Sequence, residues 1–449
     1  MSGTRAGAIA RAGSLSGDAG PTKVGIDGVT LLTAWLLLLL AVPSRLVFAP
    51  LGGAGTPAIL VGVVGALLWC WYHLHRSTPL VGGASRVRRM VLVFSFAVLV
   101  SYAGAMARPI VQAEVSTADL ALVSLVGWVG VALVAHDGIN DRARLETLVR
   151  RIAVGGGAVA LLGIAQFVTH QPLIDHIDFP GLTTNAQLDS VLGRSGFSRP
   201  SGTAIHPIEF GVVMTIVLPF ALHRGLHALD LGWLRRWWPT LAIAAAIPLS
   251  ISRSALVGSA TVLLILVPTW PRAHRRLTFA SLVGLSGAIF VLVPGMLGTL
   301  TRLFTGIGQD SSARSRTDSY GLALEFVTRD PLIGRGMGTF LPSYRILDNQ
   351  YLLLLIETGV AGVAAMLAML VTAFRTARRA RARVAVPEDR DLAQSVAAAI
   401  AAGGVSLALF DTLSFPMAAG LLFLVVGMAG SLPRLLPSSG SAPSGAAPL

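Results

Sequence analysis

Apolar runs long enough to cross a membrane recur along this whole chain, and they constrain its fold more than any other feature. A helix of roughly 20 apolar residues spans about 30 Å of hydrocarbon. Only helices and closed β-barrels satisfy every backbone polar group in lipid, and the alternating ten-residue segments of a barrel are absent from the sequence. We therefore predict an all-α polytopic membrane protein with about twelve transmembrane helices. The predicted spans are residues 29–48, 57–75, 90–106, 118–136, 152–169, 207–223, 237–251, 253–270, 277–298, 350–373, 392–410 and 416–433.

Composition and charge agree with this prediction. The chain is 53% hydrophobic and only 13% charged, whereas soluble domains carry about 25% charged residues. With the N-terminus in the cytoplasm, roughly 24 basic residues fall on the inner side and roughly 11 outside, as the positive-inside rule requires. The net charge of +13 therefore follows from topology and contact with membrane lipids rather than from a nucleic-acid partner. We expect an inner or plasma membrane protein with both termini cytoplasmic.

The predicted organisation is one membrane domain with short tails. Residues 1–28 form a cytoplasmic tail, residues 29–433 the transmembrane domain, and residues 434–449 a disordered cytoplasmic tail. Two long loops, 170–207 and 301–349, lie on the outer side. Loops of this length in a compact membrane protein usually carry function.

The second outer loop has a structure of its own. Apolar residues recur at helical spacing over residues 315–327, which predicts a short helix on the membrane surface. Asp330-Pro331 ends that helix. Glycines at 334, 336 and 338 then permit a tight path back to the membrane. Asp348 or Asn349 is expected to cap the next span.

Four arginines lie on the predicted outer side, close to the membrane boundary. Guanidinium groups bind phosphate bidentately and stay charged, so several together suit a pyrophosphate. Headgroup contact or pairing with a carboxylate is the alternative for each, because arginine is the default cation of a chain with a single lysine, Lys23. The four are Arg199, Arg253, Arg314 and Arg316.

Acidic and imidazole groups near the same boundary are candidates for proton transfer. Asp348 begins a span beside the loop arginines, and His206 precedes Pro207, which suits the first position of a helix. Helix capping is the alternative for both. Glu209 and Glu357 fall just inside spans, where an ionisable side chain is a functional candidate unless it pairs with an arginine.

Nucleotide, cofactor and metal sites are not indicated. The sequence has no Walker motif and no dinucleotide fingerprint. The histidines and aspartates of residues 170–178 lack a recognised ligand spacing, and one cysteine, Cys70, makes neither a disulfide nor a cysteine metal site within one chain. An outward-facing site without a nucleotide needs a pre-activated donor, and a polyprenyl pyrophosphate is one.

In these features the chain resembles the O-antigen ligase and polymerase superfamily, polytopic glycosyltransferases of the GT-C type. The resemblance runs from about residue 190 to residue 365. It rests on the order of several short motifs along the chain. They are Arg199 with Gly202-Thr203 and Pro207, Ser252-Arg253, the Ser312, Arg316 and Tyr320 segment, the glycine-rich run Pro331 to Phe340, Asn349 with Tyr351-Leu352, and Glu357-Thr358-Gly359.

The resemblance implies transfer of a glycan from a polyprenyl-pyrophosphate donor to a hydroxyl of a glycan, lipid or protein acceptor, with inversion and without metal or cofactor. Arg199, Arg253, Arg314 and Arg316 would bind the pyrophosphate. Asp348 and His206 would be catalytic with Arg253, and the acceptor side would include Asn349, Tyr351, Glu209 and Glu357. Family members commonly carry His-Asn where this chain has Asp348-Asn349, and asparagine where it has Ile208, so Asp348 would replace the histidine.

Three other functions remain open at this point. The protein could polymerise repeat units instead of ligating a finished glycan, and the sequence does not separate the two. It could be a transporter or flippase of a glycan or small anion, but the outer charges cluster near the surface and no internal repeat is evident, which favours an enzyme. It could also be a non-catalytic scaffold of a cell-envelope complex, consistent with the departure at Asp348.

Overall fold

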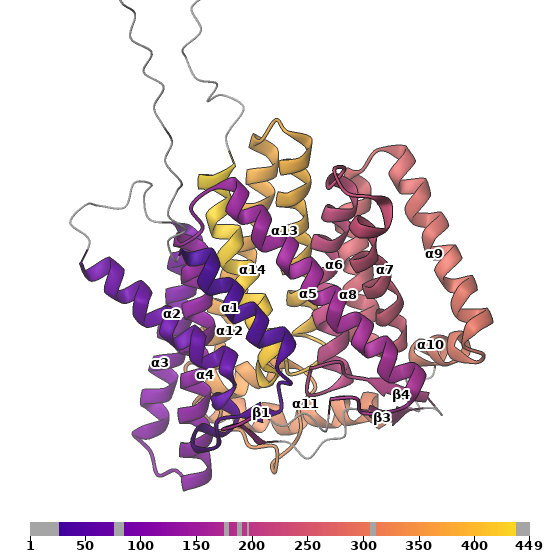
Figure 1. Ribbon diagram of the computed structural model, residues 1–449. Helices are drawn as coiled ribbons and strands as arrows, with labels where there is room; N and C mark the ends of the chain where they lie inside the picture. The colour runs from indigo at the N-terminus through magenta and orange to yellow at the C-terminus, as the bar shows by residue number, and fades with distance from the viewer. Residues whose placement is uncertain are drawn as a thin grey trace, which may run out of the picture.

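The computed structural model describes residues 27–75, 85–174, 179–185, 191–194, 197–305 and 311–436, and for residues 191–194 and 311–319 it describes the backbone. Long helices run side by side and form a bundle (Figure 1). In the first part of the chain they are α1 (Gly28–Ala41), α2 (Pro57–Leu74), α3 (Arg86–Met106), α4 (Gln112–Asp137), α5 (Arg142–Thr169), α6 (Pro207–His227) and α7 (Trp233–Leu249). In the second part they are α8 (Arg253–Leu266), α9 (Arg272–Leu292), α12 (Gln350–Arg383), α13 (Pro387–Ser406) and α14 (Pro416–Leu435).

Each predicted span falls on one of these helices, so the all-α polytopic membrane fold is confirmed. Eight of the described helices are long and apolar enough to cross a membrane; the count of twelve spans stays a prediction. The first predicted span, 29–48, was too long. Its helix ends at Ala41, because Pro43 cannot continue it, and Leu46–Val47 form a strand instead.

Small elements gather at one end of the bundle, which we call the loop end (bottom of Figure 1). Strand β1 (Leu46–Val47) pairs with β2 (Thr183–Thr184), and β3 (Val191–Arg194) with β4 (Phe197–Pro200), both antiparallel. These strands were not predicted, because two to four residues are too few for an alternating pattern. Also there are η1 (Ala49–Gly55), α10 (Met296–Thr305), α11 (Ser311–Arg329) and η4 (Thr412–Ser414).

The helix predicted over residues 315–327 is confirmed as part of α11, which ends at Arg329 just before Asp330-Pro331. It packs on the start of α12 through a small apolar cluster that includes Ala323, Phe340 and Ile356. The opposite end of the bundle carries the α6–α7 and α12–α13 turns and η2 (Val267–Thr269).

Helices α6 and α14 form the centre of the bundle. In their most apolar 18-residue stretches, 83% and 89% of the residues are buried. In helix α9 only 6% of the corresponding stretch is buried, and the helix stands apart from the rest in Figure 1. Its large apolar side chains, such as Phe290 and Leu292, are exposed. Such a face is stable only against lipid or another apolar partner.

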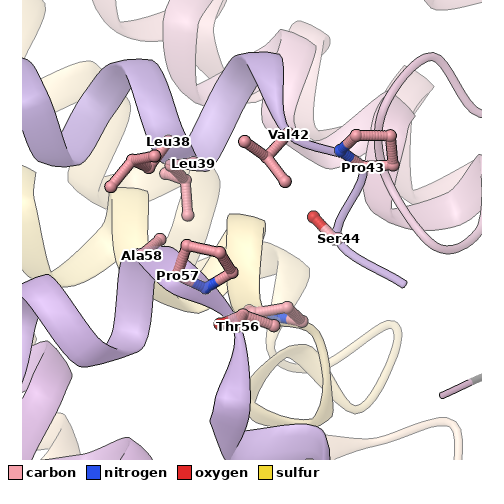
Figure 2. A pocket seen from close by; sticks show the side chains of 9 residues that line it. Leu38, Leu39, Val42, Pro43, Ser44, Thr56, Pro57 and Ala58 are labelled. Atoms are coloured by element: carbon pink, nitrogen blue, oxygen red, sulfur yellow. The ribbon is translucent and has the colours of Figure 1, made fainter. Parts of the chain in front are cut away.

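Two cavities among the described residues differ greatly in size. Between α1, α2 and the start of α14 lies a small apolar pocket (Figure 2), whose volume of about 10 Å³ has room for about one water molecule. Between α6, α7, α8, α9 and α10 lies a cavity of about 640 Å³ with a mostly apolar lining. Only the second is large enough for a lipid-sized ligand.

Candidate active site

Two of the predicted arginines lie against the same turn at the loop end. Strand β4 directs Arg199 into the protein, where its side chain is buried and its Nε donates a hydrogen bond to the main-chain carbonyl of Ser250 at 2.9 Å. Ser250 follows α7, and Arg253 is the first residue of α8. The structure therefore brings Arg199 next to the turn that carries Arg253, although the two are far apart in sequence.

The turn between α7 and α8 is strained. Ile251 has φ of 47°, a left-handed conformation that a β-branched residue rarely adopts, and it is fully buried. Such backbone conformations cost about 1–3 kcal/mol and persist where the surrounding structure holds them, often at functional sites. The hydroxyls of Ser252 and Ser254 lie 2.8 Å apart within the same turn. The start of α8, and with it Arg253, is thus held in one conformation.

His206 caps α6, which is the alternative that the sequence left open for it, and Pro207 lies in the first turn. Its Nδ1 accepts a hydrogen bond from the backbone N–H of Ile208 at 3.1 Å. Burial, together with the charge of Arg199, lowers the pKa of His206 to about 4, so the imidazole is neutral at pH 7. Since Nδ1 accepts, the proton is on Nε2, and that nitrogen is a hydrogen-bond donor. This arrangement suits orienting a substrate oxygen better than removing its proton.

Asn349, and not Asp348, caps α12. Its Oδ1 accepts from the backbone N–H groups of Tyr351 at 3.1 Å and Leu352 at 3.2 Å. The next residue, Gln350, accepts at Oε1 from the backbone N–H of Leu413 at 2.8 Å. The segment with Asp348 is therefore tied to the turn between α13 and α14.

That turn contains Asp411, an acidic residue that the sequence analysis did not select. Burial, together with the nearby charge of Asp348, raises the pKa of Asp411 to about 7. The signal in the sequence was an acidic residue in a short turn between two spans. Without a motif around it, this signal does not distinguish Asp411 from other acidic residues in loops. A carboxyl that titrates near neutral pH is a good candidate for proton transfer.

Tyr351 and Glu209 hold helices together at this end. The Tyr351 hydroxyl donates to the carbonyl of Gly404 in α13 at 2.8 Å. Glu209 is fully buried, and its two oxygens accept from the backbone N–H groups of Ile205 at 2.9 Å and Met417 at 2.8 Å. Glu209 thus caps the start of α14 and ties it to the chain before α6.

Glu357 holds the glycine-rich segment against α12. Its Oε1 accepts from the backbone N–H of Gly338 at 2.9 Å, and its carbonyl accepts from Gly336 at 2.7 Å. The predicted tight path is confirmed, because Gly334, Gly336 and Gly338 all have positive φ. Gly359, with φ of 63°, interrupts α12 where the segment crosses it. The glycine-rich motif and the Glu-Thr-Gly motif are therefore two halves of one packing interface.

A second arginine cluster, around Arg335, was also missed. Arg335 donates to the buried carboxylate of Glu114 at the start of α4, and the Tyr344 hydroxyl donates to the same oxygen. The Arg335 guanidinium lies 4.9 Å from the ring centre of Phe326 and 5.2 Å from that of Tyr344. Arg108 donates to the carbonyl of Arg335 at 2.7 Å. These contacts fasten α11 and the glycine-rich segment to α4.

Arg314 and Arg316 lie in the first turns of α11, which crosses the loop end. Their side chains lie outside the described residues. The structure thus places the backbone of all four predicted arginines at the loop end, and it describes the side chains of Arg199 and Arg253.

The family model described as O-Antigen ligase matches residues 238–367. This match supports the predicted relationship of the chain to the O-antigen ligase superfamily. A search of curated proteins finds no match.

The matched region contains Arg253, the whole of α11, the glycine-rich segment and Glu357. Arg199, His206 and Asp411 lie outside it and reach the same end of the bundle through the packing of β4, α6 and the α13–α14 turn. Together with the apolar helices, the match identifies a multi-pass membrane protein of the polysaccharide-synthesis type, related to membrane glycosyltransferases.

Proposed function

We propose that this O-antigen ligase-like protein transfers a glycan from a polyprenyl-pyrophosphate donor to an acceptor hydroxyl at the loop end, on the outer face of the inner or plasma membrane. One observation carries the proposal. Arg199 is hydrogen-bonded to the strained turn that precedes Arg253, and residues on either side of this turn, Pro248 and Leu256, line the large apolar cavity. A site of paired arginines beside an apolar cavity suits a pyrophosphate joined to a long hydrocarbon chain.

The cavity supports the lipid part of this proposal. Its lining includes Ile247 and Pro248 near the end of α7, and Leu256 one turn after Arg253. From there it extends along α9 to Trp233 and Leu277 near the opposite end. Burial of hydrocarbon contributes about 0.8 kcal/mol for each CH₂ group. A polyprenyl chain in this cavity would place its pyrophosphate beside Arg253.

The arginines would neutralise the donor and stabilise the leaving group. As the acceptor oxygen bonds to the anomeric carbon, the bond from that carbon to the phosphate oxygen breaks, and negative charge develops on the departing pyrophosphate. Arg199, Arg253 and the α11 arginines Arg314 and Arg316 would bind that charge more strongly as it forms. Direct displacement inverts the anomeric centre, and these groups need neither a metal ion nor a nucleotide.

The acceptor proton would go to a carboxylate of the α12 and α13–α14 segments. Asp348 takes the place of the family histidine in sequence, and Asp411, with its pKa raised to about 7 by burial, is a stronger base than an ordinary carboxylate. His206 would donate from Nε2 to a substrate oxygen. Asn349, Tyr351, Glu209 and Glu357 would position the segments that line the acceptor side.

Transfer by the purified protein in proteoliposomes tests the proposal. The reaction contains a native polyprenyl-pyrophosphate glycan and candidate acceptors, and release of polyprenyl pyrophosphate is measured together with product size. We expect release with a single-sized adduct, which is ligation. A ladder of products would instead indicate repeat-unit polymerisation at the same site. No release from the native donor would refute the glycosyltransferase and favour transport.

A pair of variants connects the reaction to the arginines. Arg253→Ala should abolish release while the protein still inserts and purifies normally. Arg329→Ala is the matched control, because Arg329 lies on the exposed side of α11 and pairs with Glu325 four residues away. Full activity of Arg253→Ala would remove Arg253 from the mechanism.

A further inference from the structure

Two histidines and an aspartate converge at the opposite end of the bundle, far along the helices from the arginine site. His223 and His227 are four residues apart, so both lie on one face of α6. His223 Nδ1 is 2.9 Å, and His227 Nε2 3.3 Å, from the same oxygen of Asp391, Oδ2. Asp391 belongs to the first turns of α13. The three ligand atoms come from two different helices.

The distances match the ligand shell of a small transition-metal ion. Ligands about 2.0–2.2 Å from a tetrahedral zinc ion lie roughly 3.3 Å from one another. The two histidine–aspartate distances are 2.9 and 3.3 Å, and all three ligand atoms lie within 4.8 Å of one another. Closing the remaining gap needs only a small rotation of the imidazole rings, and His227 is exposed enough for an ion to enter.

A neighbouring tryptophan fixes the aspartate in the orientation that a metal site needs. Trp270, which follows η2, donates from Nε1 to Oδ1 of Asp391 at 2.9 Å. This bond occupies one carboxylate oxygen and turns the other toward the two imidazoles. Outer hydrogen bonds of this kind orient ligands in known metal sites.

A similar cluster elsewhere in the chain shows what a purely structural arrangement looks like. Asp137 also contacts two histidines, His136 at 2.6 Å and His73 at 3.7 Å, but through different oxygens, and Arg88 forms an ion pair with it at 3.3 Å. The arginine balances the charge there. Among the described residues, by contrast, only the two histidines form ion pairs with Asp391.

We propose that His223, His227 and Asp391 bind a zinc ion that joins α6 to α13. Two imidazole nitrogens and one carboxylate oxygen are ligands that zinc prefers, whereas magnesium and calcium prefer oxygen alone. Water would complete the tetrahedron. Binding replaces the hydrogen bonds of the metal-free cluster, and the Nδ1 proton of a neutral His223 moves to Nε2 of the same ring so that Nδ1 can coordinate the ion. The ion lies at the other end of the bundle from the transfer site, so its role is to stabilise the packing of two helices.

Metal content and stability test this proposal without any activity measurement. The full chain is purified in detergent with affinity tags removed, stripped with EDTA, and dialysed against micromolar zinc or magnesium. We expect about one zinc ion per chain by mass spectrometry, a rise of the unfolding temperature with zinc but not with magnesium, and a tetrahedral visible spectrum with cobalt.

Two variants and a control decide whether these residues are the ligands. His227→Ala and the isosteric Asp391→Asn should each lose the zinc-dependent rise and bind zinc at least about tenfold more weakly. His73→Ala, in the cluster balanced by Arg88, should behave like the wild type. The His227 side chain is partly exposed, so we expect His227→Ala to fold even if Asp391→Asn does not. Wild-type protein without bound zinc, or equal binding by His227→Ala, would overturn the proposal.

Discussion

Arg199 donates a hydrogen bond from Nε to the carbonyl of Ser250 at 2.9 Å, and this contact joins the β3–β4 strand pair to the turn that precedes α8. The bond aligns one edge of a guanidinium group in a buried position. Because the guanidinium group is planar, fixing Nε also fixes the directions of its two terminal nitrogens. The geometry of the arginine, and not only its charge, is therefore set by the α7–α8 turn.

Replacing Arg199 with lysine tests that geometry. Lysine keeps the charge but loses the planar fork, so we expect polyprenyl-pyrophosphate release to fall about 10- to 100-fold, the equivalent of one charged hydrogen bond. Arg329→Lys on the exposed face of α11 is the control and should have wild-type rates. An Arg199→Lys enzyme as active as wild type would mean that charge alone is needed.

His206 makes the stability of the protein depend on acid. Burial and Arg199 lower its pKa from the ordinary 6.5 to about 4. Between these values the unfolded chain binds a proton that the folded protein excludes, so the free energy of unfolding falls as the pH drops through this window, by on the order of 3 kcal/mol. Asparagine caps helices well and does not titrate. His206→Asn should therefore flatten thermal stability measured between pH 7 and pH 4.

The same variant separates two roles of His206. If the side chain only caps α6, His206→Asn will keep transfer activity. If Nε2 orients a substrate oxygen, activity will fall while the unfolding temperature at pH 7 stays close to that of the wild type. An unchanged pH dependence of stability would contradict the buried, neutral imidazole.

Asp411 has the opposite pH dependence. Its pKa is raised by burial from 3.8 to about 7, so between these values the folded protein binds a proton that the unfolded chain does not. Stability therefore falls as the pH rises through the window, by on the order of 4 kcal/mol. Asp411→Asn should remove this loss and unfold at a higher temperature than wild type at pH 8, with little difference at pH 4.

Transfer activity of Asp411→Asn should be low at every pH if the carboxylate accepts the acceptor proton. A stabilised but inactive variant is the expected combination, since catalytic groups are often destabilising. Equal stability of variant and wild type at pH 8 would show that Asp411 is not buried as the structure has it.

Gly359→Ala should destabilise the interface of the two glycine-containing motifs. Gly359 has φ of 63°, and a Cβ atom there would lie 2.4 Å from the carbonyl carbon of Leu332. We expect a loss of about 2–4 kcal/mol in thermal unfolding. Gly284→Ala in α9 is the control, because a Cβ there has nothing within 4 Å. That change should stabilise by about 0.5–1 kcal/mol.

Local rules accounted for much of what the sequence predicted correctly. Apolar runs located the helices, the His206-Pro207 pair located the start of α6, and the glycine positions located the tight segment before α12. Each depends on residues close in the chain. The first span was predicted too long because hydrophobicity continues past Pro43, where backbone chemistry ends the helix.

Contacts between distant segments could not be predicted in the same way. Asp411 is an ordinary acidic residue in sequence, and only burial beside the Asp348 segment gives it an unusual pKa. Arg335 has no motif of its own, and its role depends on Glu114, more than two hundred residues away. His223 and His227 become a candidate ligand pair only because the fold brings one carboxylate oxygen of Asp391 close to a ring nitrogen of each.

Sequence patterns alone predict a helical membrane protein, the positions of most of its helices, and the arginines that lie at one end. The length of an apolar run and the backbone preferences of proline and glycine depend on residues close in the chain, so they can be recognised in the sequence. Packing in three dimensions sets which groups share an environment: Arg199 with the α7–α8 turn, Asp411 with Asp348, and Asp391 with its two histidines. The reason is physical, because hydrogen bonding and burial depend on distance in space, and packing rather than sequence separation sets that distance.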